Sequence, residues 1–242
     1  MSSLADSARS RQATLDPGKL FQQLRDDYPC ANTCWVAFSG GMDSTVLLTA
    51  LVEGRVDLPF TLKAVHVDHG LQPASADWSA HCADICHSLG IPLSRLRVDA
   101  RPRRGESPEA AARATGDAAM GKLMGDGHLL LTAHHRDDPA EAGLLQLLRA
   151  AGVAGLAAMP ALKRFGAGWH GRPCLDLPRS ALRRWAEAHS LKWIEDPSNA
   201  LIDADRNYLR HEVLPRLSAR WPAAEASLAA SASYAAEALG AL

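Results

Sequence analysis

The hydrophobic positions of this chain follow two patterns, short apolar runs and longer stretches with helical spacing. Four short runs have the length of strands and lie near residues 34–38, 62–67, 93–98 and 128–132, the third of them mixed apolar and polar. Each run is followed by a stretch that predicts a helix, near residues 43–53, 76–89, 108–124 and 138–150. This alternation predicts βαβ units and a parallel sheet with helices on both faces. Right-handed crossovers then give a doubly wound α/β fold.

The pattern changes at both ends of the chain. Residues 1–16 are polar and predict a disordered terminus, whereas residues 18–28 have the spacing of an amphipathic helix. Glycines within residues 162–175 predict a short hairpin or an irregular segment. The remainder predicts helices at 179–189, 208–219 and 222–242 and a polar loop at 194–207. These last helices form a small helical appendage to the sheet.

The composition is that of an ordinary globular protein. Its 242 residues suffice for one large core, and 47% of them are hydrophobic and 22% charged. No apolar run is long enough to cross a bilayer, and the first twelve residues contain no hydrophobic signal segment. We therefore expect a cytoplasmic protein. The five cysteines lack CxxC spacing, which favours reduced thiols over a metal or redox site.

The charges are balanced overall but unevenly distributed. The net charge of −1 argues weakly against a large nucleic-acid-binding surface. The arginines nevertheless form three groups along the chain, Arg95 to Arg104, Arg179 to Arg184 and Arg206 to Arg220. Each group is either a solvated surface or a contact for an anionic ligand.

The most informative motif is Ser-Gly-Gly-Met-Asp-Ser at residues 39–44, between the first apolar run and the first helix of the sheet domain. Two glycines allow a tight turn that presents backbone N–H groups, and the following helix directs its positive end to the same place. These features predict a phosphate-binding loop, although a tight strand-to-helix turn would need the same glycines. No Gly-Lys-Ser/Thr follows, so the motif is not a Walker A loop. The residues expected to hold phosphate are Ser39, Gly40, Gly41, Met42, Asp43, Ser44 and Thr45.

Polar residues follow two further strands. His66 and Asp68 end the second apolar run on one face of the predicted strand, which suits either a nucleotide pocket or a structural capping network. After the fourth run come His134, Asp137 and Asp138, with Glu141 three residues beyond Asp138 on the same helix face. Paired carboxylates bind Mg²⁺ or an ammonium group, and histidines orient phosphate or transfer protons.

A third polar cluster spans residues 195–199 and 205–211. Its residues alone predict a turn followed by a charged helix start. In this order, however, the motifs of the chain resemble the catalytic domain of the tRNA(Ile)-lysidine synthetase family, a group of PP-loop ATP pyrophosphatases. The shared features are the motif at 39–44, Val-His-x-x-His-Gly-Leu at 65–71, Ala-His-His-x-Asp-Asp-x-x-Glu at 133–141, Arg-x-x-Gly-x-x-Gly-Leu at 149–156 and Glu-Asp-Pro-Ser-Asn…Arg-Asn-x-x-Arg at 195–210.

The resemblance implies an ATP-dependent ligase. Its members adenylate O2 of the wobble cytidine in a minor tRNA(Ile) with a CAU anticodon and release pyrophosphate. The ε-amine of free L-lysine then attacks C2 and expels AMP. The resemblance therefore implies ATP and Mg²⁺ as cofactors and tRNA(Ile) and L-lysine as partners. A homodimer is compatible with the sequence.

The resemblance also implies roles for individual residues. Asp43, with His134 or Asp137, would support Mg²⁺ beside the phosphate loop, and His66 would line the nucleotide pocket. Asp138 and Glu141 would bind the ammonium group of lysine. On the same grounds, Arg206 and Arg210 would hold ATP phosphate or tRNA backbone, and Arg149 and Asn199 would lie on the substrate side.

Several residues depart from the pattern of this family, all on the substrate side. They are Gly116, Asp117, Pro139, Ala142, Ala150 and Ala151. Two alternatives therefore stay open, a non-catalytic nucleotide- or tRNA-binding module and another PP-loop tRNA-modifying enzyme. A thiolase would need CxxC pairs, which the sequence lacks.

These interpretations divide the chain into four parts. Residues 1–16 are the disordered terminus, 17–160 the PP-loop nucleotide-binding domain and 161–221 the C-terminal part of the catalytic domain. Residues 222–242 form a terminal helix. Because family members usually continue into tRNA-binding domains, we interpret this helix as a linker to such a domain.

Overall fold

The computed structural model describes residues 14–54, 60–70, 75–102, 108–157, 159–202 and 204–240. The predictions made for residues 1–13, Leu71, Arg103, Arg104 and the last two residues lie outside the described residues. Within the described ranges, Leu15 is buried against the core and the Asp16 carboxylate accepts hydrogen bonds from the backbone of the first helix. The folded part of the chain therefore begins before residue 17.

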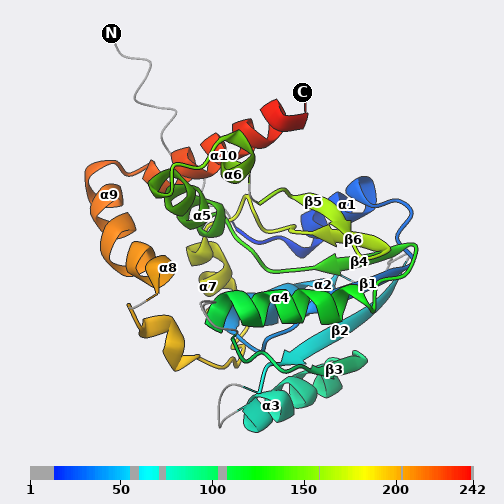
Figure 1. Ribbon diagram of the computed structural model, residues 1–242. Coiled ribbons are helices and arrows are strands. Elements are labelled where there is room, and N and C mark those ends of the chain that lie inside the picture. Colours follow the sequence, from blue (N-terminus) through cyan, green and yellow to red (C-terminus); the bar gives the residue numbers. More distant parts are fainter. Residues whose placement is uncertain are drawn as a thin grey trace.

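One sheet organises the fold (Figure 1). Among the described residues it has six strands in the order β3-β2-β1-β4-β6-β5, and all neighbours are parallel except the β5–β6 hairpin. The strands are β1 Thr33–Ala37, β2 Thr61–Asp68, β3 Leu93–Arg97, β4 His128–Leu131, β5 Leu162–Phe165 and β6 Gly168–Gly171. The predicted parallel α/β sheet is confirmed, and the hairpin extends it by two strands.

Helices cover both faces of the sheet and its carboxyl edge. They are α1 Pro17–Asp27, α2 Met42–Glu53, α3 Ser75–Ser88, α4 Pro108–Gly121, α5 Asp137–Leu148, α6 Val153–Leu156, α7 Arg179–Ala188, the 3₁₀ helix η2 Pro197–Ala200, α8 Asp205–Tyr208, the π-helical η3 Leu209–Val213, α9 Leu214–Arg220 and α10 Ala224–Gly240. None of the described helices is both long and apolar enough to span a membrane.

Side-chain alternation along the strands produces two apolar cores. Cys34 and Val36 of β1 point into the larger core, which α1, α2, α3 and α7 cover. Trp35, between them, points to the opposite face with Val65 and Leu130, where α4 covers a smaller core. Because both faces are covered there, the central strands β1 and β4 are mostly apolar, whereas β3 and β5 nearer the edges contain polar residues.

The order of the strands defines where a ligand can bind. The chain moves from β1 to β2 and β3 on one side and then returns to β4 on the other side of β1. Connections that leave β1 and β4 in opposite directions open a crevice at their carboxyl ends. The glycine loop follows β1 and the His-His-x-Asp-Asp segment follows β4, so both motifs lie at this crevice.

The helix predicted at 208–219 begins earlier and is interrupted. It runs from Asp205 through one π-helical turn to Arg220, and the preceding polar segment contains the 3₁₀ turn η2. Pro215, just beyond the π turn, has no N–H to donate to residue 211, which is consistent with a change of hydrogen-bond register there. The interruption changes which side chains of this segment face α5.

The last helix is part of the folded domain. α10 packs along α5 and α6, where Figure 1 shows the three helices together beside the sheet. The expected terminal helix is therefore packed on the domain, and its role as a linker to a further domain stays a prediction.

The C-terminus of α5 has a strained residue. Ala150 has φ of +53°, and the N–H groups of Ala150 and Ala151 donate to the carbonyl oxygens of Leu147 and Gln146. This is a Schellman end, in which the left-handed position usually holds glycine. A Cβ atom in this region costs energy, and Ala150 is one of the positions where the chain departs from the resembled family.

We therefore expect Ala150→Gly to raise the free energy of unfolding by about 1 kcal/mol, because relief of the left-handed strain outweighs the greater flexibility of unfolded glycine. Urea denaturation followed by circular dichroism measures this. Ala151→Gly is the matched control and should not stabilise the protein. Equal or opposite shifts of the two variants would show that Ala150 is unstrained.

Candidate active site

The loop after β1 presents the start of α2 to the crevice. Gly41 is the N-cap of α2 and makes no side-chain cap, so the first N–H groups of the helix have no partner within it. Ser39 Oγ accepts from Gly41 N and lies 3.1 Å from Ser44 Oγ. The positive end of the twelve-residue helix α2 therefore points to open backbone donors.

Three of the residues predicted to hold phosphate also have structural contacts. Thr45 is buried and its hydroxyl donates to the carbonyl oxygen of Gly41, and the Met42 side chain lies in the core. Ser44 also donates to Gly41 O. The side-chain hydroxyls thus shape the loop, and only the backbone of Met42 is available to a ligand.

Gly40 cannot be replaced without moving its neighbours. Its φ is +81°, and a Cβ atom there would lie 2.9 Å from Cys82 Sγ and 3.2 Å from Ile194 Cδ1. The Gly40 carbonyl oxygen accepts from Ile194 N at 2.9 Å. The loop is therefore packed between α3 and the segment that precedes η2.

A cavity of about 450 Å³ opens beside this loop at the ends of β1 and β2. His66 is buried in its wall, and its Nδ1 donates to the carbonyl oxygen of Phe38 at 2.9 Å, which leaves Nε2 for another partner. Apolar side chains and a few polar groups complete the lining, among them Val65, His69, Trp78, Asp117, Met120, Ile194 and Asn199. An apolar pocket with a few fixed polar groups is suited to a nucleoside.

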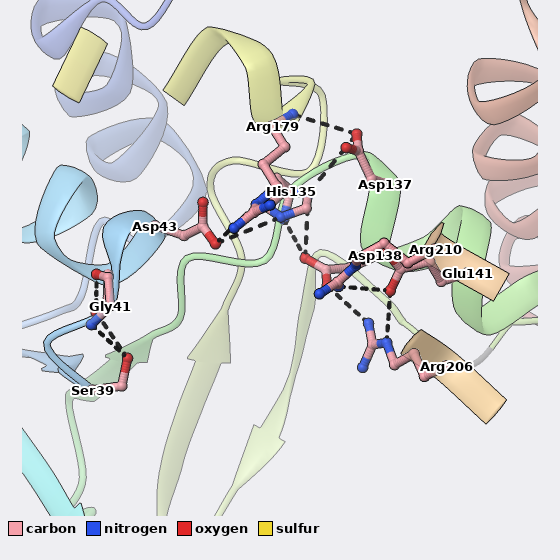
Figure 2. A network of polar contacts seen from close by, with 11 residues as sticks. Ser39, Gly41, Asp43, His135, Asp137, Asp138, Glu141, Arg179, Arg206 and Arg210 are labelled. Carbon is pink, nitrogen blue, oxygen red and sulfur yellow. Dashed lines mark hydrogen bonds and ion pairs between the residues drawn. The ribbon is translucent and has the colours of Figure 1, made fainter. Parts of the chain in front are cut away.

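His135 lies at the centre of the polar network that extends from the loop (Figure 2). Its Nε2 is 3.8 Å from Asp43 Oδ2, and its Nδ1 is 3.9 Å from Asp137 Oδ1 and 3.6 Å from Asp138 Oδ2. A role beside Asp43 was expected for His134 or Asp137. In the structure His135 contacts Asp43 and separates it from Asp137.

The site fits Mg²⁺ through Asp43. Its Oδ1 is buried and accepts no hydrogen bond from the described residues. No cluster of three or more metal-ligating side chains occurs within the described ranges. Mg²⁺ commonly binds one or two carboxylates and completes its shell with phosphate oxygens and water. Asp43 would therefore hold the ion together with a bound nucleotide.

Asp138 and Glu141 are held by two arginines. Arg210 donates from Nε and Nη2 to the two oxygens of Glu141, at 2.6 and 2.9 Å. Arg206 bridges the carboxylates, with Nε 2.8 Å from Glu141 and Nη2 2.8 Å from Asp138. The Glu141 side chain is 1% exposed, so its charge is neutralised entirely by these bonds.

Two of the sequence-based assignments concern residues of this cluster. Arg206 and Arg210 were expected to hold ATP phosphate or tRNA backbone; in the structure both bind the carboxylates of α5, and their contact with a ligand stays a prediction. Asp138 and Glu141 were expected to hold an ammonium group, and their four oxygens already accept hydrogen bonds, Asp138 Oδ2 from His135 N at 2.7 Å. An ammonium group bound there would share these carboxylates with the guanidinium groups or replace one of them.

The electrostatics of Asp138 reflect its position. Burial by itself raises the pKa of its carboxyl. The nearby His135, His134 and Arg206 and the hydrogen bond from His135 N–H lower the pKa by a larger amount, so it lies below its ordinary value. Asp138 is therefore ionised at neutral pH.

His134 lies near Asp138 but makes its hydrogen bonds in a second network. Thr132 Oγ1 lies 2.7 Å from His134 Nδ1 and 2.8 Å from His170 Nε2. Burial, helped by nearby Arg172, lowers the pKa of His134 to about 4 and that of His170 to about 3. His134 is consequently neutral at pH 7 and a weak base in the free protein.

The remaining predicted residues lie further from the loop. Arg149 pairs with Asp205 at 3.1 Å in an exposed ion pair that links α5 to α8. Asn199 lines the cavity, and its carbonyl oxygen accepts from His211 Nε2. The structure thus brings Asn199 near the nucleotide seat and places Arg149 at the outer end of α5.

Comparison with known proteins agrees with this geometry. The sequence model of the PP-loop domain matches residues 16–217. The chain belongs to the PP-loop family.

Relatives of this PP-loop domain come from several bacteria. The chain is 47% identical to the tRNA(Ile)-lysidine synthase of Methylococcus capsulatus over 211 residues, which are 87% of this chain and 48% of that protein. It is 50% identical to the tRNA(Ile)-lysidine synthase of Pseudomonas aeruginosa over 221 residues, which are 91% of this chain and 49% of that protein. The chain thus spans about half the length of the curated relatives it matches.

A solved structure has the same fold. The U34-tRNA thiolase NcsA from Methanococcus maripaludis, with its [4Fe-4S] cluster, superposes with a TM-score of 0.74 at 19% identity, covering 90% of this chain and 78% of that one. At this identity the match supports the fold of the PP-loop domain alone.

Sequence patterns did not assign His135 or Arg179 to the site. His135 is adjacent to His134, and spacing does not tell which of two neighbouring histidines points toward Asp43. Arg179 begins α7, and its Nε lies 3.6 Å from Asp43 Oδ2. The only signals for Arg179 were its place in an arginine group and the proline before it.

We expect Glu141→Gln to lower the free energy of unfolding by roughly 3 kcal/mol, because two partly buried guanidinium groups lose their counter-charge. Glu187→Gln, which removes an exposed ion pair with Arg183, should cost less than about 0.5 kcal/mol. Urea denaturation of both variants measures the difference. Similar small losses would mean that the Glu141 cluster contributes little to stability.

Stability should also fall as the pH is lowered from about 6.5. In the unfolded chain both histidines bind a proton below about pH 6.5. In the folded protein His134 and His170 become protonated only as the pH approaches about 4 and 3 respectively, so protonation favours the unfolded chain. For His170→Gln we expect the slope of unfolding free energy between pH 6 and pH 4 to fall by about 1.4 kcal/mol per pH unit at most. His87→Gln, at an exposed position on α3, is the control, and equal slopes in the two variants would contradict this assignment.

Proposed function

We propose that this chain is the PP-loop catalytic domain of a tRNA(Ile)-lysidine synthase. It would act in the cytoplasm on a tRNA(Ile) with a CAU anticodon, with ATP, Mg²⁺ and free L-lysine. The observation that carries the proposal is the 44–50% identity to relatives named tRNA(Ile)-lysidine synthase, over 81–96% of this chain. The geometry of the crevice supports it.

The first step requires a seat for ATP. The cavity beside His66 suits the nucleoside, and the open N–H groups at the start of α2 suit its phosphates. O2 of the wobble cytidine forms a bond to the α-phosphorus, and the bond from that phosphorus to the bridging oxygen breaks. Pyrophosphate leaves with the electron pair. Mg²⁺ held by Asp43 would neutralise charge on the leaving group.

The second step requires a site for lysine. Its ε-amine forms a bond to C2 of the adenylated cytidine, and the C2–O2 bond breaks to release AMP. The carboxylates of Asp138 and Glu141 would accept hydrogen bonds from the ammonium form, shared with the guanidinium groups or in place of one of them. The amine must lose a proton before it attacks, and a carboxylate of this cluster or the neighbouring His134 would accept it.

A sulfur-transfer function is less well supported. Cys34, Cys82, Cys86 and Cys174 are buried, and burial raises the pKa of each thiol above its ordinary value. Buried thiols of this kind are poor nucleophiles. The fifth cysteine, Cys30, is exposed and lies before β1, at the other end of that strand from the loop.

Mass analysis of a tRNA(Ile) transcript with a CAU anticodon tests the proposal. After incubation with the protein, ATP, Mg²⁺ and lysine, we expect the wobble cytidine to gain the mass of one lysyl group. Asp43→Ala should abolish this gain while the variant remains folded. An AMP adduct without lysine would support adenylation only. An unchanged transcript together with unchanged ATP would overturn the proposal.

A further inference from the structure

Arg179 occupies a position between the phosphate seat and the carboxylates of α5. It is the first residue of α7, a helix that packs against α2, and its backbone N–H donates to Asp137 Oδ1 at 3.4 Å. Its guanidinium Nε lies 3.6 Å from Asp43 Oδ2 (Figure 2). Asp43 is in the first turn of α2, so the guanidinium lies next to the helix end that would receive phosphate.

The contact between Arg179 and Asp43 is loose. At 3.6 Å it is an ion pair without a hydrogen bond, and the two side chains are 38% and 28% exposed. Partly exposed pairs of this kind are weak and exchange partners easily. Arg206 and Arg210 differ in this respect, because several bonds of 2.6–2.9 Å hold them on Asp138 and Glu141. Arg179 is therefore the more available cation beside the loop.

A bound triphosphate would add negative charge beside Asp43 and Arg179. Asp43 lies close to the phosphate seat and would repel an incoming polyanion unless a cation compensates it. Once Mg²⁺ or phosphate approaches, the guanidinium gains more from phosphate oxygens than from Asp43, because it can donate to them through two parallel N–H bonds.

We propose that Arg179 is a catalytic residue that moves from Asp43 to the pyrophosphate portion of ATP. This inference rests on the proposed function. As the bond between the α-phosphorus and the bridging oxygen breaks, negative charge develops on the departing pyrophosphate, and the Arg179 N–H groups stabilise it. Arg179 transfers no proton, because a guanidinium stays protonated in proteins.

The same helix offers a matched control. Arg183 lies one turn after Arg179, is similarly exposed, and faces Glu187 at 3.9 Å rather than Asp43. Removal of either arginine takes one positive charge from α7. Only removal of Arg179 changes the groups beside Asp43, so a difference between the two variants reports position rather than net charge.

Calorimetric titration with inorganic pyrophosphate and with AMP tests the proposal, using the unchanged chain, Arg179→Ala, Arg179→Lys and Arg183→Ala in the presence of Mg²⁺. We expect Arg179→Ala to weaken pyrophosphate binding at least tenfold and AMP binding less than twofold. Arg179→Lys should restore part of the loss, and Arg183→Ala should bind both ligands normally. Thermal unfolding checks that each variant is folded.

A second titration uses a variant that is expected to bind pyrophosphate more tightly. Without Mg²⁺, Asp43→Asn should bind pyrophosphate more tightly than the unchanged chain, because Arg179 loses its partner and the seat loses a negative charge. Normal pyrophosphate binding by folded Arg179→Ala would overturn the proposal, as would equal weakening of AMP and pyrophosphate. Arg179-dependent pyrophosphate binding by a protein that leaves tRNA unmodified would retain this inference and overturn the proposed function.

Discussion

A carboxylate that is excluded from water must have its charge neutralised where it lies, and Glu141 imposes this constraint on the domain. Its side chain is 1% exposed, and its partners come from residues 65 and 69 positions later in the chain. Bonds from Arg206 and Arg210 therefore fix the segment α8–η3–α9 against α5. The π turn at Leu209–Val213 lies in the same segment and contains Arg210. The residue that lies in the π turn, Arg210, is thus also one that forms the long-range ion pair with Glu141.

Much of the fold follows from the sequence because its determinants are local. The central parallel strands are mostly apolar, and the glycines before α2 mark the strand-to-helix loop, so the sheet and the position of that loop were both predictable. The pairing of arginines with carboxylates within the site was not predictable. Spacing placed Asp138 and Glu141 on one face of a helix, but it does not tell that Arg206 and Arg210 return to them across the crevice.

The polar residues of the crevice differ in how firmly they are held. The Glu141 cluster is buried and joined by short bonds, whereas the Asp43 pair is more exposed and has only contacts of 3.6 Å or longer. His135 contacts both regions. The firmly held Glu141 cluster and the loosely held Asp43 therefore lie on either side of the His135 ring. Asp43 is the one next to the open N-terminal end of α2.

The hydroxyl group of Thr132 has a consequence for the two histidines that share it. Both rings are neutral at pH 7, so each carries one proton on one of its two nitrogens. Because the hydroxyl has a single hydrogen, His134 Nδ1 and His170 Nε2 cannot both be bare, and if both are protonated the hydroxyl hydrogen loses its partner. The satisfied arrangements are the two in which one ring donates and the other accepts. The tautomers of the two rings are therefore coupled, and a change at one requires the hydroxyl to turn and the other ring to respond.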